Sequence, residues 1–161
     1  MRTILSASAL LGAAFLPACV MVGTEDVQWD TAPAVEHYSP PVTDQGVVLP
    51  FSKGVRVGDT IYLSGELGID YSVNTLVPGG TGPETTQIFA NVEMTLAHFG
   101  AGLEDIVKCT VFLDDMGTFA EMNAAYTAAL PDPKPARSTF GADGLALGAA
   151  LEIECIAVSP R

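Results

Sequence analysis

Residues 150–158 read ALEIECIAV, an apolar run that carries two glutamates two positions apart. Side chains alternate between the two faces of a β-strand, so Glu152 and Glu154 share one face while Ile153 and Cys155 share the other. An ionised carboxylate is costly to bury without a partner, so the glutamate face must meet water, another subunit or a cleft. This stretch therefore predicts a sheet with one apolar face under helices and one polar face.

Two amphipathic helices are predicted upstream of this strand. Pro83 is expected to open the first, because a proline suits the first helical position. Its apolar stripe recurs at three- and four-residue intervals at Ile88, Val92, Leu96 and Phe99. The second begins with a capping box, Thr118-x-x-Glu121. Its buried stripe is expected to be Phe119, Met122, Tyr126 and Leu130.

The remaining β-prone runs complete the element order. They are Val47–Pro50, Gly54–Val57, Thr60–Gly65, Ile106–Leu113, Arg137–Gly141 and Ala150–Val158. Residues 70–82 form a predicted loop, whose glycines are not followed by the Lys-Ser/Thr pair of a phosphate-binding loop. The order β-β-β-α-β-α-β-β predicts one α+β domain with two helices packed on one face of a sheet.

The N-terminus has the pattern of an export signal. Arg2 precedes an apolar run from Ile4 to Leu16, which is too short for a membrane-spanning helix of about 20 residues. Leu16-Pro17-Ala18-Cys19 resembles a bacterial lipobox, in which cleavage before the cysteine leaves that thiol lipidated. Simple secretion and a buried N-terminal helix are the alternatives.

This interpretation divides the chain into three parts. Residues 1–18 are a lipoprotein-type signal peptide, residues 19–45 are a tether with an ordered end, and residues 46–161 are the folded domain. The protein is then expected on the periplasmic face of a bacterial membrane, or soluble in the periplasm or medium. Lipidation at Cys19 would be its attachment to the membrane.

Acidic residues dominate the charge of the chain. Nineteen Asp and Glu stand against seven Lys and Arg, a net charge of −12. Cleavage before Cys19 removes one cation and no acid, so six cations against nineteen acids leave −13. Lysine and arginine contacts to phosphates dominate nucleic-acid affinity, so nucleic acid is not expected as a partner.

The cysteines and histidines indicate no metal site. The chain has no C-x-x-C, and His37 and His98 lie far apart without ligand-like neighbours. No metal or other cofactor is therefore expected. Cys109 and Cys155 each lie in an apolar strand, and we expect two buried free thiols, although adjacent strands in an oxidising compartment would let them pair.

Arg137 stands out in a chain so poor in cations. It begins a strand of small and apolar residues, fifteen positions before Glu152. One interpretation is an ion pair between Arg137 and a glutamate, or a solvated sheet face. The other is a site in which the guanidinium binds an anion and Glu152 handles protons, since a carboxyl in a dry pocket can act as general acid or base.

Several ordered blocks resemble the RidA/YjgF family of reactive-intermediate imine deaminases. They include Pro135-Ala136-Arg137-Ser138-Thr139 and the run from Leu151 to Val158, preceded by residues 50–55, 63–66 and 107–113 and by Phe119 to Tyr126. The resemblance covers roughly residues 46–158. It implies a chorismate-mutase-like fold, assembled as a homotrimer with clefts at the subunit interfaces.

The resemblance also implies roles for individual residues. Arg137 would bind the carboxylate of a 2-imino or enamine acid, and Glu152 would activate the water that releases ammonia and leaves a 2-keto acid. Thr139 would supply main-chain contacts, Ser64 and Asn123 would shape the cleft, and Phe51 would form an aromatic wall.

Three positions depart from the family pattern. Phe51 stands where tyrosine is frequent, Thr139 where cysteine is frequent, and Glu66 where glutamine is common. None of these changes removes the arginine or the glutamate. A non-catalytic envelope sensor that binds small acids through Arg137 is an alternative. An endoribonuclease, a label that some family members carry, conflicts with the acidic charge.

Overall fold

A computed structural model describes residues 32–40 and 49–160 of the chain. The expected signal peptide, Cys19, most of the expected tether and the first half of the predicted strand Val47–Pro50 lie outside these residues, while its second half, Leu49 and Pro50, is not in a strand. In the part that the structure describes, no helix is both long and apolar enough to cross a membrane.

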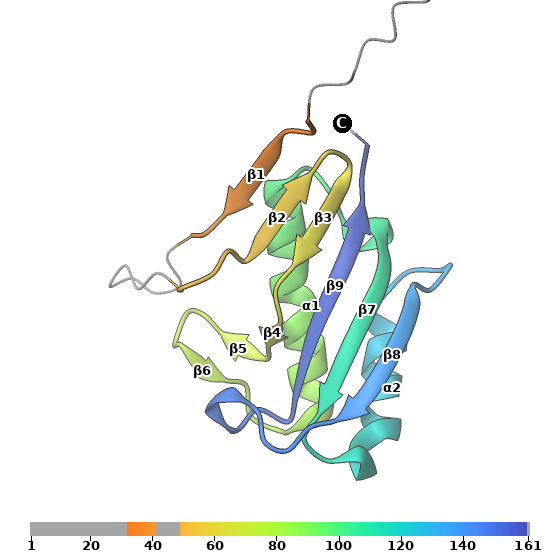
Figure 1. Cartoon of the computed structure of the whole chain (residues 1–161). Coiled ribbons are helices and arrows are strands. Elements are labelled where there is room, and N and C mark those ends of the chain that lie inside the picture. The colour runs from red at the N-terminus through yellow and green to blue at the C-terminus, as the bar shows by residue number, and fades with distance from the viewer. Residues whose placement is uncertain (1–31, 41–48, 161) are drawn as a thin grey trace, which may run out of the picture. The chain divides into compact units, whose positions relative to one another are not determined.

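A mixed sheet forms one layer of the domain (Figure 1). Its strand order is β1-β2-β3-β9-β7-β8, and short β4 pairs with β9 next to the end of β3. The pair β7 and β8 is parallel, and the other pairs are antiparallel. The strands of this sheet are β1 (Val35–Tyr38), β2 (Gly54–Val57), β3 (Thr60–Leu63), β4 (Glu66–Leu67), β7 (Ile106–Leu113), β8 (Ala136–Gly141) and β9 (Leu151–Val158).

Two helices, α1 (Thr81–His98) and α2 (Phe119–Ala129), cover one face of this sheet, as Figure 1 shows. On β9, Leu151, Ile153, Cys155 and Ala157 are buried, while the residues between them are partly or fully open to solvent. The α1 stripe of Ile88, Val92, Leu96 and Phe99 is buried, and so are Met122, Tyr126 and Leu130 around α2. The predicted α+β class and the two-faced β9 are thus confirmed.

The sheet begins upstream of the expected domain boundary. Strand β1 (Val35–Tyr38) lies within the residues assigned to the tether and pairs along its length with β2. Tyr38 stacks on His98, with 3.9 Å between the ring centroids. An edge strand exposes much of both faces, which is why its sequence shows no clear period. The predicted loop 70–82 likewise contains strand β6 (Thr75–Leu76), which forms a hairpin with β5 (Ile69–Asp70).

The ends of the helices differ from prediction. Helix α1 starts at Thr81, so Pro83 is its third residue rather than its first. The capping box of α2 was wrong: a 3₁₀ turn over Met116–Thr118 leads directly into α2, and no side chain caps its first residue. The Glu121 carboxylate instead accepts from the Gly82 N–H at 2.8 Å, and thereby joins the N-terminal ends of the two helices.

The prediction of free thiols was also wrong. Cys109 of β7 and Cys155 of β9 face each other in the antiparallel register and form a disulfide. Both side chains point to the helix-covered face and are almost completely buried. Pairing depends on this register, with the two Cα atoms 4.1 Å apart, and sequence alone does not reveal strand register.

Candidate active site

The Arg137 side chain lies on the helix-covered face, at the edge of the sheet formed by β8. Its Nη2 donates to Asn123 Oδ1 at 2.9 Å, and its guanidinium carbon lies 4.6 Å from the centre of the Tyr126 ring. Phe119, predicted to be buried, is 37% exposed, with its ring centre 5.6 Å from the same carbon. Its Nη1 also donates to Met122 Sδ at 3.9 Å, so helix α2 holds the planar guanidinium by stacking and two hydrogen bonds, while the group stays partly open to solvent.

Two unpaired hydroxyls occur near this arginine. Among the described residues, Tyr126 Oη and Thr139 Oγ1 are buried without a hydrogen-bond partner. Burial raises the pKa of the Tyr126 hydroxyl, while the Arg137 charge acts in the opposite direction. Buried polar groups are nearly always paired, so an unpaired hydroxyl indicates a place where a water or ligand group could bind. Thr139 also lies two positions from Arg137 on the same strand.

Glu152 lies on the opposite, open face of the sheet. It pairs in register with Phe112 of β7 and with Leu67 of β4. Desolvation by partial burial, followed by the charges of Glu154 and Glu66, raises the pKa of Glu152 above that of an ordinary glutamate. A carboxyl with a raised pKa is suited to proton transfer near neutral pH.

Gly65 makes room for this carboxylate. A Cβ atom added at Gly65 would lie 1.7 Å from Glu152 Oε1 and 2.7 Å from its Cδ. Real Cβ atoms essentially never come closer than 3.0 Å to another heavy atom. Gly65 was not among the predicted site residues, although a glycine in a predicted strand often marks close approach of another group.

Ser64 and Phe51 lie on the same side of the molecule as Gly65. The Ser64 hydroxyl donates to the Ser52 carbonyl oxygen at 2.7 Å, so its proton is committed to the backbone. Phe51 is 48% exposed and lines a cavity of about 360 Å³ together with Gly65. This cavity has the size of a small-molecule site.

The predicted site residues thus form two groups within one chain. Arg137, Asn123 and Thr139 belong to the edge at β8 and α2, whereas Glu152 lies on the open face. Strand β7 separates β8 from β9. The contacts of Arg137 are with α2 rather than with a glutamate, so the alternative of an ion pair between Arg137 and a glutamate of the same chain is wrong.

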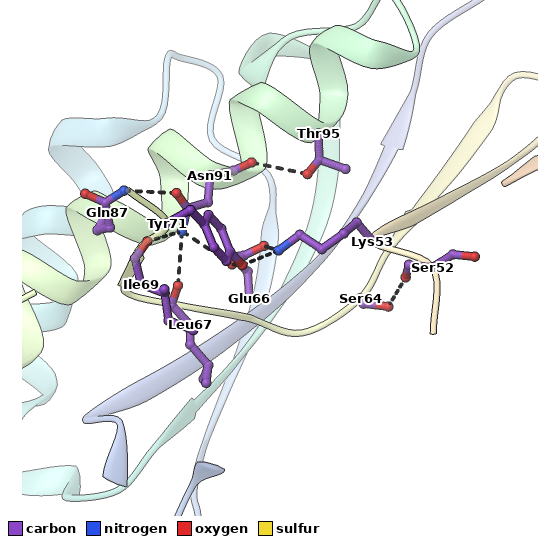
Figure 2. A network of polar contacts seen from close by, with 10 residues as sticks. All are labelled: Ser52, Lys53, Ser64, Glu66, Leu67, Ile69, Tyr71, Gln87, Asn91 and Thr95. Carbon is purple, nitrogen blue, oxygen red and sulfur yellow. Dashed lines mark hydrogen bonds and ion pairs between the residues drawn. The ribbon is translucent and has the colours of Figure 1, made fainter. Parts of the chain in front are cut away.

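A buried ion pair adjoins the second group. Lys53 donates to Glu66 Oε2 and to the Tyr71 hydroxyl, which itself donates to Glu66 Oε1 at 2.7 Å (Figure 2). Asn91 of α1 donates to the Ile69 carbonyl oxygen at 2.9 Å and to Glu66 Oε1 at 3.4 Å. Glu66 was predicted only as a departure from the family pattern, and Lys53 and Tyr71 were not among the predicted site residues. The sequence signal for Lys53 was its charge, because it lies next to a predicted strand in a chain that has only seven Lys and Arg.

Metal coordination has no support in the part of the chain that the structure describes, where no three His, Cys, Asp or Glu side chains form a metal-binding group. The site residues instead offer an arginine fork, a proton-accepting carboxyl and an apolar cavity. These groups suit a small organic acid, since a planar guanidinium matches a carboxylate.

The fold is of the α+β class, with a mixed sheet that carries two helices on one face, and Arg137 and Glu152 lie on different faces of that sheet. The chain belongs to the endoribonuclease L-PSP family, which includes the RidA/YjgF proteins and matches residues 31–159. This finding confirms the family resemblance. The match also includes β1, which the expected domain boundary at residue 46 left out.

Individual relatives agree with this membership. The chain is 39% identical over 109 residues to the 2-iminobutanoate/2-iminopropanoate deaminase of Mus musculus, covering 68% of this chain and 81% of the relative. It is 37% identical over 123 residues to the mitochondrial protein mmf1 of Schizosaccharomyces pombe, and the alignment covers 74% of this chain and 73% of the relative.

Solved structures show the same fold. RidA from an Antarctic Psychrobacter has a TM-score of 0.66 and 34% identity, and the alignment covers 81% of this chain and 96% of that one. Yeast Mmf1 has a TM-score of 0.67 and 33% identity, and the alignment covers 80% of this chain and 98% of that one.

Proposed function

We propose that the protein hydrolyses 2-imino acids, and their enamine tautomers, to 2-keto acids and ammonia. Relatives at 37–39% identity carry the name 2-iminobutanoate/2-iminopropanoate deaminase. The observation that carries the proposal for this chain is its pair of chemical groups. A guanidinium is oriented by Asn123 and Tyr126, and the Glu152 carboxyl has a pKa raised by its surroundings.

Arg137 would bind the substrate carboxylate through two parallel hydrogen bonds. Its bonds to Asn123 Oδ1 and Met122 Sδ use two of the five N–H groups of the guanidinium, which leaves three for the substrate. Backbone groups at Thr139 would add contacts on the same strand. Because this recognition acts at short range, the net negative charge of the protein, screened over about 8 Å at physiological salt, would slow encounter without preventing binding.

Glu152 would act as the proton-transfer group. It takes a proton from water as the water oxygen bonds to C2 of the imine, and it passes that proton to the imine nitrogen, which becomes an amine. The second proton of the attacking water then passes to that nitrogen, the C–N bond breaks, ammonia leaves and a carbonyl remains. Ser64 would accept a hydrogen bond at the cleft, since its own proton goes to Ser52. Phe51 would form an aromatic wall.

The active site would form between subunits, in a homotrimer. Arg137 and Glu152 of one chain lie on opposite faces of the sheet, so a single substrate can contact both only if they come from different chains. The open face carries exposed apolar side chains suited to such an interface: Tyr62 at 49%, Phe140 at 55% and Val158 at 41% exposure. A contact between two different surfaces generates a ring when the rotation between neighbouring subunits closes, and a trimer is one such ring.

Export to the periplasm as a lipoprotein anchored at Cys19 is part of this proposal. The sequence pattern of residues 1–19 supports it. The Cys109–Cys155 disulfide supports it independently, because disulfides persist in oxidising compartments and are rare in the cytosol. Replacing Cys19 with alanine should release the protein from membranes, and unchanged fractionation would contradict lipidation.

Turnover of imines tests the proposed reaction. Imines would be generated in situ by an amino-acid oxidase, and the release of 2-keto acid followed with wild type, Arg137→Ala and Glu152→Gln. We expect Arg137→Ala to raise KM and Glu152→Gln to lower kcat by about 100-fold or more. Equal activity of wild type and Arg137→Ala would contradict the deaminase proposal. Saturable binding of 2-keto acids without any turnover would favour the envelope sensor instead.

A further inference from the structure

The cavity beside Gly65 has apolar walls and a polar end. Phe51, Leu67, Ile69 and Leu147 contribute to its walls, while Lys53 and Tyr71 lie at the polar end. Its volume is about 360 Å³. Because Gly65 borders this cavity and also contacts the Glu152 carboxylate, the cavity lies next to the group that would transfer protons.

This volume exceeds the needs of a small substrate. The side chains of 2-iminopropanoate and 2-iminobutanoate have one and two carbons, comparable in size with one or two water molecules of about 30 Å³ each. Either would leave most of the cavity unfilled. Apolar walls gain by contact with apolar ligand surface, so the cavity fits a longer side chain with an apolar body.

The polar end carries a cation whose charge is balanced. The Lys53 ammonium has three donor hydrogens, and in the described part of the chain two of them go to Glu66 and to the Tyr71 hydroxyl (Figure 2). A third donor is left for a ligand. Because Glu66 already neutralises this cation, a carboxylate at the end of the ligand side chain would be repelled by the Glu66 charge. An uncharged oxygen acceptor would not be repelled.

The rim of the cavity holds an unusual backbone conformation. Leu147 has φ 60° and ψ 8°, in the left-handed region that a leucine rarely adopts, and its side chain is 73% exposed. Such residues gather at ligand sites, where the surrounding structure maintains them. Here the conformation presents an apolar side chain beside the opening of an apolar cavity.

We propose that this cavity receives the substrate side chain, and that the Lys53–Glu66 pair selects imino acids whose apolar side chain ends in an uncharged hydrogen-bonding group, such as a phenol. This inference rests on the proposed function, since it concerns the same site. Lys53 is then a specificity-determining residue that contacts the far end of the substrate, away from the reacting carbon.

The test uses two substrates that differ by a single hydroxyl. Imines of tyrosine and phenylalanine would be generated by the same oxidase, and kcat/KM compared. A hydrogen bond from a charged donor predicts about a tenfold preference for the phenol. Equal values, or a preference for the phenyl imine, would overturn the inference. Turnover of 2-iminobutanoate with neither aromatic imine accepted would also overturn it while leaving the proposed function intact.

A variant tests the role of Lys53 directly. Lys53→Met is combined with Glu66→Gln, so that no unpaired charge is left buried. The ratio of phenol to phenyl kcat/KM should fall from about tenfold to about twofold or less. An unchanged ratio in a folded variant would overturn the assignment to Lys53. The wild-type ratio remains decisive if this variant fails to fold.

Failure of the proposed function can be distinguished from failure of this inference. If wild type hydrolyses no imine, including 2-iminobutanoate, the deaminase proposal fails. Binding of 4-hydroxyphenylpyruvate and phenylpyruvate, measured by calorimetry, then decides the inference alone. About tenfold tighter binding of the hydroxylated acid would support it, and equal binding would refute it.

Discussion

Substituting alanine for Gly65 should impair catalysis without unfolding the protein. The added Cβ would lie 1.7 Å from Glu152 Oε1, and close contacts need at least 3.0 Å. The carboxylate must therefore move by at least 1.3 Å, the difference of these two distances. Glu152 can make this shift because its carboxylate is the far end of a flexible side chain.

The size of the effect follows from this displacement. A misplacement of about 1 Å in a catalytic arrangement can cost about 100-fold in rate. We therefore expect Gly65→Ala to lower kcat by about 100-fold, which corresponds to about 2.7 kcal/mol in transition-state stabilisation. Removing a glycine also restricts the unfolded chain, which contributes about 0.4–1 kcal/mol of stability and offsets part of the local strain.

The assay is keto-acid release from imines generated in situ, with thermal unfolding measured in parallel. Gly141→Ala is the matched control, since its added Cβ would meet the flexible Met116 side chain at 3.1 Å and no site residue. We expect the control to keep wild-type turnover and both variants to unfold within about 4 °C of wild type. Wild-type turnover by Gly65→Ala would refute the placement of Glu152 as the proton-transfer group.

Three further changes test other parts of the structure. Replacing Cys109 and Cys155 together with alanine should lower the free energy of unfolding by about 4 kcal/mol in urea titrations, since the disulfide closes a loop of 46 residues, and no loss would argue against the disulfide. Activity of wild type should fall as pH falls through the raised pKa of Glu152, because the ionised form accepts the proton. Glu154→Gln removes a charge that raises this pKa, so the acid limb of kcat/KM should move to lower pH, and a shift upward would contradict the cause given. Tyr126→Phe removes a buried unpaired hydroxyl and should leave stability unchanged or raise it by about 1 kcal/mol, whereas a clear loss would reveal a partner for that hydroxyl.

Elements with a strong local pattern could be predicted from sequence. Strands β2 and β7 have the predicted bounds because their apolar residues and flanking turn signals lie within a few positions of one another. The two faces of β9 also follow from alternation alone. Strand β1 was not predicted because its stability comes from contacts with residues that are distant in sequence. These contacts are its pairing with β2 and the stacking of Tyr38 on His98.

The identities of Arg137 and Glu152 as candidate site residues could be predicted from the sequence, but their arrangement in space could not. Arg137 and Glu152 stand out as charged residues in apolar strands, yet sequence does not reveal which face of the sheet a side chain of an edge strand occupies. In β8, Phe140 is 55% exposed while Arg137 contacts α2, the reverse of a simple inside–outside pattern. Lys53 and Glu66 meet across the end of the β2–β3 hairpin, a contact that depends on the register of β2 and β3.

Mixing two inactive variants tests most directly whether the site is shared between chains. Arg137→Ala keeps Glu152, and Glu152→Gln keeps Arg137, so neither variant alone can form a site that has both residues. If the two variants are unfolded, mixed in equal amounts and refolded into rings, about one quarter of the interfaces would combine both intact residues. Our account predicts recovery of about 25% of wild-type turnover in the mixture. No recovery, with both variants assembled together, would contradict a site built from two subunits.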